Sequence, residues 1–167
     1  GASIEATRGR IDVGTEGGAP VLITSLADDA CSVDGDSTCD TNGDGSDTRP
    51  LPGDWNSIEF DANSAGGAMV NAAIRYGGTR TSSDEQIRVA RSQVSLDDLD
   101  IAFGSGSGIL VQSAAPTLSN LRIHDNAAEG IVVDTNETPL TIELTGTSIY
   151  DNGQGGNTAV GALLVDA

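Results

Sequence analysis

The sequence predicts an all-β fold, a right-handed parallel β-helix (solenoid) of about six rungs with one long acidic surface loop. Ile87, Ile109 and Ile131 follow one another at intervals of 22 residues, which is a spacing typical of proteins that stack similar units. Around them, apolar and polar residues alternate over short stretches that end at Gly, Asn or Asp, as expected of half-buried strands. We therefore expect a single domain over residues 1–167.

The clearest repeat unit runs from Gly108 to Asn126 and reads as a strand, a corner, a second strand and a polar exit. Aligning the units predicts columns of inward side chains, because alternate residues of a strand share a face. The first strand of each unit contributes two columns: Ile58, Ile87, Ile109, Ile131 and Leu163, then Phe60, Val89, Val111, Val133 and Val165. The second strand contributes Ile74, Ile101, Ile123 and Ile149. At a corner, we expect Asn71, Asp98 and Asn120 to stack and to hydrogen-bond along the axis.

The segment 26–54 interrupts the repeats, because it is rich in Asp, Gly and Ser and nearly lacks apolar side chains. We predict that it is an inserted surface loop. Its centre, DTNGDG from Asp40, has the D-x-N-x-D-G form of a calcium loop, in which oxygens at alternate positions converge on one ion. Leu51 stands at the twelfth position, where an EF-hand carries Glu, so the loop is not an EF-hand. The expected cofactor is calcium, and the expected ligands are Asp40, Asn42, Asp44, Ser46, Asp47 and Asp36. The alternative is a disordered acidic loop held only by a disulfide.

The only two cysteines, Cys31 and Cys39, lie close together in this flexible loop. The spacing favours a disulfide, and a disulfide favours an exported protein. Zinc is the rival interpretation, but two Cys and one distant His make a poor zinc set. The expected location is extracellular or at the cell surface.

The charge of the chain is strongly negative, with 25 acidic residues against eight Arg and a net charge of −17. Nucleic acids and anionic membranes reward positive charge, so neither is an expected partner. No apolar run approaches the length of a membrane span, and membrane insertion is not expected.

Several short stretches of the sequence resemble those of a known class of proteins. GTEGGAPVLITS, the DTNGDG insertion, PGDW and VNAAIRYGG resemble secreted bacterial right-handed parallel β-helix repeat proteins over nearly the whole chain. The DTNGDG loop also looks like the calcium loops of dockerin and thrombospondin type 3 repeats. The resemblance implies a secreted β-helix with a calcium-loop insertion, but not one activity, because such folds serve many functions.

An enzymatic function has little support in the sequence. The chain has no Lys, and we find no motif that resembles those of pectate lyases or polygalacturonases. Asp125 and Asp151 could act as paired carboxylates, but both fall at corners, where Asx residues serve a structural purpose. His124 should point outward without a Ser or Cys partner. We expect no catalytic residue and no enzyme.

One outward column changes from polar to apolar along the repeats. After Glu59 and Arg88 it continues as Leu110, Val132 and Leu164, which predicts an interface or a stripe covered by a loop. Uncapped sheet ends would allow copies to stack head to tail. We therefore expect an extracellular structural protein, a self-associating subunit of a surface filament or adhesin segment, stabilised by calcium. The alternative is a carbohydrate-active enzyme (polysaccharide lyase- or hydrolase-like) or a glycan-binding module, with glycans as partners.

Overall fold

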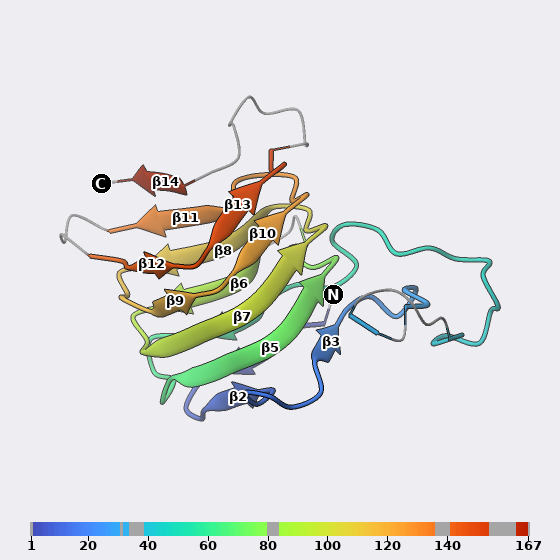
Figure 1. Ribbon diagram of the computed structural model, residues 1–167, viewed down its shortest axis with the longest axis horizontal. Helices are drawn as coiled ribbons and strands as arrows, with labels where there is room; N and C mark the ends of the chain where they lie inside the picture. The colour runs from blue at the N-terminus through green and yellow to red at the C-terminus, as the bar shows by residue number, and fades with distance from the viewer. Residues whose placement is uncertain are drawn as a thin grey trace.

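A computed structural model describes residues 2–30, 32–33, 39–79, 84–135 and 141–153, together with the backbone of 163–166. The chain is all-β, and its strands form two sheets in which every described pairing is parallel. The first sheet has six strands in the order β1 (Ile4–Ala6), β4 (Ile58–Phe60), β6 (Glu85–Ala90), β8 (Ser107–Gln112), β11 (Ile131–Asp134) and β14 (Leu163–Asp166) (Figure 1).

The second sheet has eight strands, two of them long. Its long central strands are β5 (Gly67–Arg75) and β7 (Val94–Ala102). The six short ones are β2 (Ile11–Val13), β3 (Val21–Ile23), β9 (Thr117–Ser119), β10 (Arg122–His124), β12 (Leu144–Thr145) and β13 (Ser148–Tyr150). The N-terminal strands β2 and β3 lie at one end of this sheet and the C-terminal strands β12 and β13 at the other (Figure 1).

The expected register of the apolar columns is confirmed. Ile58 pairs with Ile87, Ile87 with Ile109, Ile109 with Ile131, and Ile131 with Leu163. In the second sheet the aligned residues are Ile23, Ile74, Ile101, Ile123 and Ile149. Alternation sets this register because a slip of one residue would move every apolar side chain to the opposite face.

The predicted fold class, a regular right-handed parallel β-helix of about six rungs, is wrong in this form. A regular solenoid would add one equivalent strand to each sheet with each repeat, in a single order. In the eight-stranded sheet, β5 instead pairs with β2, β3 and β7, and β7 pairs with both β9 and β10. The strand order is therefore not clearly that of a solenoid, and the architecture is all-β with two mostly parallel sheets.

Three residues with a left-handed backbone mark the bend in the strands of the second sheet. Asn71, Asp98 and Asn120 occupy corresponding positions, and all three have positive φ (54, 51 and 54°). Asn and Asp tolerate this left-handed conformation better than other residues with side chains. Pairing continues through the bend in β5 and β7, whereas the stretch around Asn120 splits into β9 and β10. A sequence period of 22 residues does not distinguish these two outcomes.

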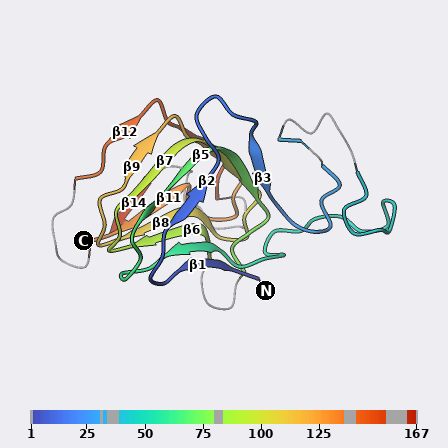
Figure 2. The same cartoon turned by 90° about the horizontal axis from the view of Figure 1, so that it is seen from below.

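Both sheets contribute to one hydrophobic core. Its largest fully buried side chains are Phe60, Ile58, Met69, Ile74, Ile87, Leu96, Leu99, Ile101, Ile109, Leu118, Leu121 and Ile123. Seen from below (Figure 2), the two sheets run beside each other, and the N-terminal strands are nearest the viewer. Burial of these side chains supplies the main driving force for folding, roughly 1.5–3 kcal/mol for each large one.

The described part of the acidic segment 26–54 projects from the body, as predicted for a surface loop (Figure 1). It returns to the core at Trp55, whose indole Nε1 donates to the Arg75 carbonyl at 2.7 Å. A Cβ at Gly77 would lie 2.7 Å from the Trp55 ring, so this contact requires Gly. Among the described residues, no helix combines the length and apolar character needed to cross a membrane.

Candidate functional site

The acidic loop closes around the Asp40 carboxylate. Asp40 Oδ1 accepts hydrogen bonds from the amides of Gly43 at 2.7 Å and Asp44 at 2.9 Å. Asp40 Oδ2 accepts from the Gly45 amide at 3.0 Å. Gly43 and Gly45 have φ of 83 and 78°, so the tight turn relies on glycine. The D-x-N-x-D-G pattern therefore produces a ring of backbone around one carboxylate.

The Asp44 carboxylate contacts two further polar side chains of the loop. Its Oδ2 accepts from Thr48 Oγ1 at 2.6 Å and from Asn42 Nδ2 at 3.1 Å. Its Oδ1 is buried and has no hydrogen-bond partner. A buried carboxylate oxygen without a partner carries a desolvation cost that a bound cation would remove. This oxygen is the observation that fits the expected calcium ion.

Ser46 and Asp47, two further expected ligands, are exposed. The Ser46 amide donates to the Asp44 carbonyl at 3.1 Å. Asp36 lies outside the described residues. Within the described ranges no group of three or more His, Cys, Asp or Glu side chains is arranged to hold a metal. Calcium would therefore also need neutral oxygens, such as the Asn42 amide or backbone carbonyls, which it accepts readily.

The expected disulfide is supported on one side only. Cys39 is disulfide-bonded, and its amide donates to the Asp29 carbonyl at 2.8 Å. Cys31 lies outside the described residues, so the pairing of Cys31 with Cys39 remains a prediction.

His124 differs from its expected role as an exposed surface residue. Its side chain is 12% exposed, because it stacks on the Tyr150 ring (centroids 5.0 Å apart) and meets the Phe103 ring edge-on at 6.0 Å. His124 Nδ1 lies 2.7 Å from Asp125 Oδ2, and Nε2 lies 3.4 Å from Asp100 Oδ1. His124 and Tyr150 are aligned on the neighbouring strands β10 and β13, which brings their rings together.

Arg122 contacts two of the residues that surround His124, one on each neighbouring strand. Its guanidinium lies 3.4 Å from Asp100 Oδ2 and donates to the Tyr150 hydroxyl at 3.0 Å. The hydrogen bond to Tyr150, and then the charge of Asp100, raise the pKa of Arg122 above its ordinary value. Asp100 and Arg122, which are aligned on β7 and β10, thus form an ion pair. Glu59 and Arg88 are aligned in the same way on β4 and β6, but among the described ion pairs Arg88 lies 3.9 Å from Glu85.

The repeated Asp-Asn dipeptides at 125–126 and 151–152 serve the backbone. Asp125 and Asp151 have φ of 53 and 51° and are exposed, as expected for turn residues. The following Asn126 and Asn152 are 0% and 6% exposed. The structure therefore supports a turn-forming role for the two aspartates. The two asparagines, in contrast, are buried.

Gln86, Asn126 and Asn152 form a ladder of buried amides that the sequence analysis missed. Gln86 Nε2 donates to Asn126 Oδ1 at 2.8 Å, and Asn126 Nδ2 donates to Asn152 Oδ1 at 2.9 Å. The stack expected at Asn71, Asp98 and Asn120 does not form such a ladder. There, Asn71 donates to the Gly18 carbonyl and Asn120 donates to Asp97.

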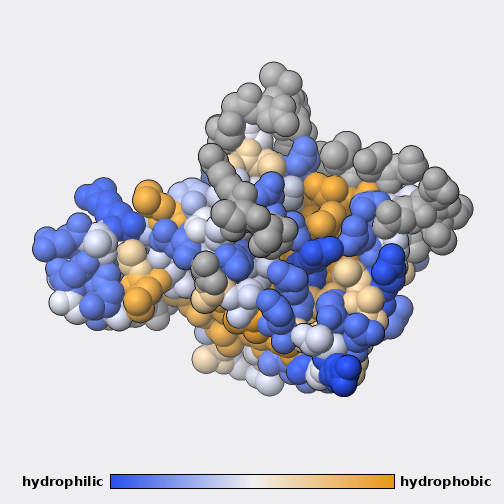
Figure 3. Space-filling view, turned by 180° about the vertical axis from the view of Figure 1, so that it is seen from behind, coloured by the Kyte–Doolittle hydropathy of each residue, from blue (hydrophilic) through white to orange (hydrophobic). Residues whose placement is uncertain are grey.

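The expected apolar stripe exists as an alignment of three strands. Leu110, Val132 and Leu164 are in register on β8, β11 and β14. Leu110 and Val132 are half-buried, and only the backbone of Leu164 is among the described parts of the chain. Seen from behind (Figure 3), hydrophobic surface lies between hydrophilic regions on the side of the six-stranded sheet. Its role as an interface remains a prediction.

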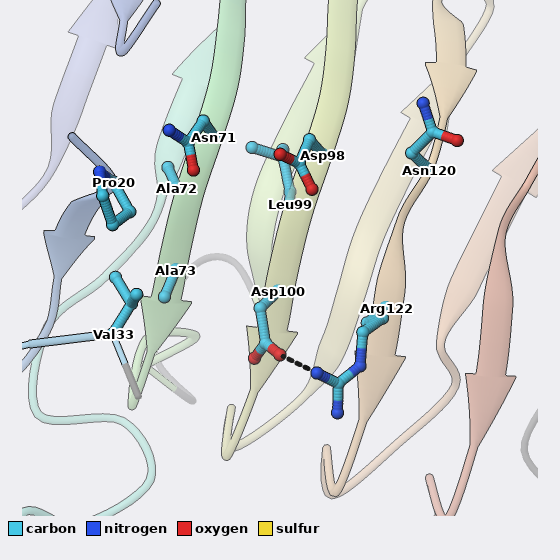
Figure 4. Close-up of a pocket in the computed structure, with 10 residues that line it drawn as sticks. All are labelled: Pro20, Val33, Asn71, Ala72, Ala73, Asp98, Leu99, Asp100, Asn120 and Arg122. Carbon is cyan, nitrogen blue, oxygen red and sulfur yellow. Dashed lines mark ion pairs between the residues drawn. The ribbon is translucent and has the colours of Figure 1, made fainter. Parts of the chain in front are cut away.

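A cavity of about 270 Å³ lies on the outer face of the eight-stranded sheet. Asn71, Asp98 and Asn120 form a row across neighbouring strands, and the Asp100–Arg122 ion pair lies on the same face (Figure 4). Pro20 and Val33 form the wall on the side of β3 and the acidic segment.

Comparison of the chain with protein-family models, curated proteins and solved structures finds no match. The resemblance to β-helix repeat proteins and calcium loops thus rests on the sequence strings alone.

Proposed function

We propose that the chain is an extracellular structural protein whose copies associate head to tail through the edges of their sheets, with calcium ordering the acidic loop. The observation that carries this proposal is the isoleucine column of the eight-stranded sheet. Among the described residues it runs from Ile23 on β3 to Ile149 on β13. Both side chains are half-buried, so each could bury more surface against another copy.

The two ends of this sheet are complementary. All described pairings are parallel, so β13 of one copy and β3 of the next could continue the same hydrogen-bond pattern. Placing Ile149 on Ile23 would extend the apolar column through the contact. The two edges differ, which makes the contact heterologous, and a heterologous contact that does not close on itself produces a fibre.

Other features agree with a structural role. The amide ladder and the isoleucine column run across the strands and tie the layers together. The only cysteine among the described residues, Cys39, is disulfide-bonded, which is usual outside the reducing cytosol. The unpartnered oxygen of Asp44 supports calcium as the stabilising ion.

Static light scattering after size exclusion, combined with electron microscopy, tests the proposal. The wild-type chain should gain mass with concentration and form linear particles. Ile149→Lys should remain monomeric, because it places a charge where the next copy's Ile23 would pack. The matched control is Ser148→Lys, which adds the same charge to the exposed side of the same strand and should still assemble. A wild-type chain that stays monomeric at 100 µM and above with calcium present would refute the proposal (~8 kcal/mol of association energy corresponds to micromolar affinity).

A further inference from the structure

We infer that the cavity on the outer face of the eight-stranded sheet binds a neutral saccharide, with one sugar ring seated against Pro20 and Val33. The inference is tested separately from head-to-tail association, because the cavity opens on the face of the sheet, although Pro20 in its wall directly precedes the edge strand β3. At about 270 Å³ the cavity is slightly smaller than pockets for drug-sized ligands, which start near ~300 Å³. It would therefore hold one ring of a longer chain.

The lining has the mixed chemistry that a sugar requires. Asp98 offers an exposed carboxylate, Asn71 and Asn120 offer amides, and Arg122 offers a guanidinium. A sugar hydroxyl both donates and accepts hydrogen bonds, so a ring of hydroxyls can use acceptors and donors side by side.

Small and apolar side chains make the space. Ala73 lies on β5 beneath the cavity, and its single methyl group leaves room above the strand. Pro20 and Val33 add apolar surface that can pack against the C–H groups of a sugar ring. Val33 is held in place because the Arg75 guanidinium donates to its carbonyl.

Charge and geometry favour a neutral sugar over other ligands. Asp98 and Asp100 both line the cavity, while the positive charge of Arg122 is engaged by Asp100. An anionic sugar would meet this field and the net charge of −17 unfavourably. A peptide strand would need free backbone groups, but the backbones of β5 and β7 pair with each other beneath the cavity.

The test is a glycan array with neutral and anionic oligosaccharides, followed by calorimetric titration of the neutral hits. We expect neutral glycans to bind and oligogalacturonate not to bind. Asp98→Asn keeps a residue that tolerates the left-handed backbone at this position (φ 51°) and should weaken binding at least tenfold. Ala73→Leu should abolish it by filling the cavity. Asp151→Asn is the matched control, because Asp151 has the same φ of 51° but does not line the cavity, and it should bind as the wild type does.

Three outcomes would overturn the inference: no neutral glycan binds, oligogalacturonate binds better than neutral glycans, or Asp98→Asn binds as tightly as the wild type. If Ala73→Leu fails to fold, Asp98→Asn still decides the question, because its side chain is exposed. Failure here leaves head-to-tail association untouched, since that proposal is measured by mass and particle shape.

Discussion

Asn126 donates from Nδ2 to Oδ1 of Asn152 across 2.9 Å, although the two residues are 26 positions apart in the sequence. The Asn126 backbone amide also donates to the same oxygen, at 3.1 Å. This contact places a fully satisfied polar pair beside an apolar core. Such pairs fix the alignment of neighbouring strands, because any shift would leave buried amides without partners.

The first prediction concerns this amide ladder. Asn126→Ala removes an acceptor used by the Gly104 amide at 2.9 Å and by Gln86 Nε2 at 2.8 Å. It also removes one of the two donors to the buried Oδ1 of Asn152, which keeps only the backbone amide of residue 126. We expect the free energy of unfolding to fall by roughly 3–5 kcal/mol, since several buried groups lose their partners at once.

Asn152→Ala is the comparison variant, measured by the same urea denaturation. Asn152 follows the edge strand β13 and donates to the carbonyls of Ile123 and Tyr150 at 2.9 and 3.0 Å. It has a ladder partner on one side only among the described residues, so its loss should cost less, roughly 1–2 kcal/mol. Equal costs for the two variants would contradict the ladder interpretation.

The second prediction concerns calcium and the acidic loop. Calcium that binds the native state alone should raise the melting temperature; at a concentration of 100 Kd the gain is about 2.7 kcal/mol. EDTA should reverse the shift. Asp44→Asn should reduce it strongly, because the variant lacks the negative charge on the unpartnered oxygen.

Asp61→Asn serves as the control, since Asp61 lies outside the loop and caps a turn by accepting from the Asn63 amide at 2.7 Å. It should keep the full calcium response. If the melting temperature of each protein, wild type and Asp44→Asn, is the same in calcium as in EDTA, calcium has no part in the stability of this loop.

The third prediction concerns Glu85, whose side chain is 8% exposed. Burial raises its pKa, and the Arg88 guanidinium 3.9 Å away offsets this only in part. A carboxyl with a raised folded-state pKa stabilises the fold fully below its unfolded-state pKa, and this contribution is lost as pH rises through the folded-state value. Glu85→Gln should therefore be more stable than the wild type at pH 7.

Unfolding measured from pH 3 to pH 8 checks the sign. The advantage of Glu85→Gln over the wild type should grow with pH and then level off. Asp84→Asn, which changes the exposed neighbouring acid, should show no such trend. The contrary result is a stability difference between Glu85→Gln and wild type that moves in favour of the wild type from pH 4 to pH 7. That result would mean that ionised Glu85 is stabilising.

The fourth prediction concerns Asp97, whose pKa is shifted in the opposite direction from that of Glu85. Ser119 Oγ donates to Asp97 Oδ1 at 2.6 Å and Asn120 Nδ2 donates to the same oxygen at 2.9 Å. These hydrogen bonds lower the pKa of Asp97. A lowered folded-state pKa contributes stability above the unfolded-state value, and the contribution disappears as pH falls through the folded-state pKa. Ser119→Ala should cost about 1 kcal/mol at pH 7 and less under acid conditions.

Acid titration of stability distinguishes this electrostatic cost from lost packing. The difference between wild type and Ser119→Ala should shrink under acid conditions as Asp97 becomes protonated. Thr117→Ala, on the exposed side of the same short strand, controls for strand propensity. A constant difference at all pH values would show that the hydroxyl does not act through the Asp97 charge.

Much of the strand register follows from the sequence alone. Ile58, Ile87, Ile109 and Ile131 align as expected, because alternation decides which side chains face the core and a column of equal residues packs without gaps. The turn chemistry of the DTNGDG loop also follows, since Asp at its first position and Gly at the sharp bends are local requirements.

The three-dimensional structure is needed to see which strands continue through the bends at Asn71 and Asp98 and which break at Asn120. The resulting strand order is not clearly that of a solenoid. The tertiary structure also decided that His124 is enclosed by Phe103 and Tyr150, and that Asn126 meets Gln86 and Asn152 inside the core. Periodicity reports which face of a strand each side chain occupies. It carries no information on which distant polar groups become partners, because that depends on how neighbouring strands are placed once the apolar core has formed.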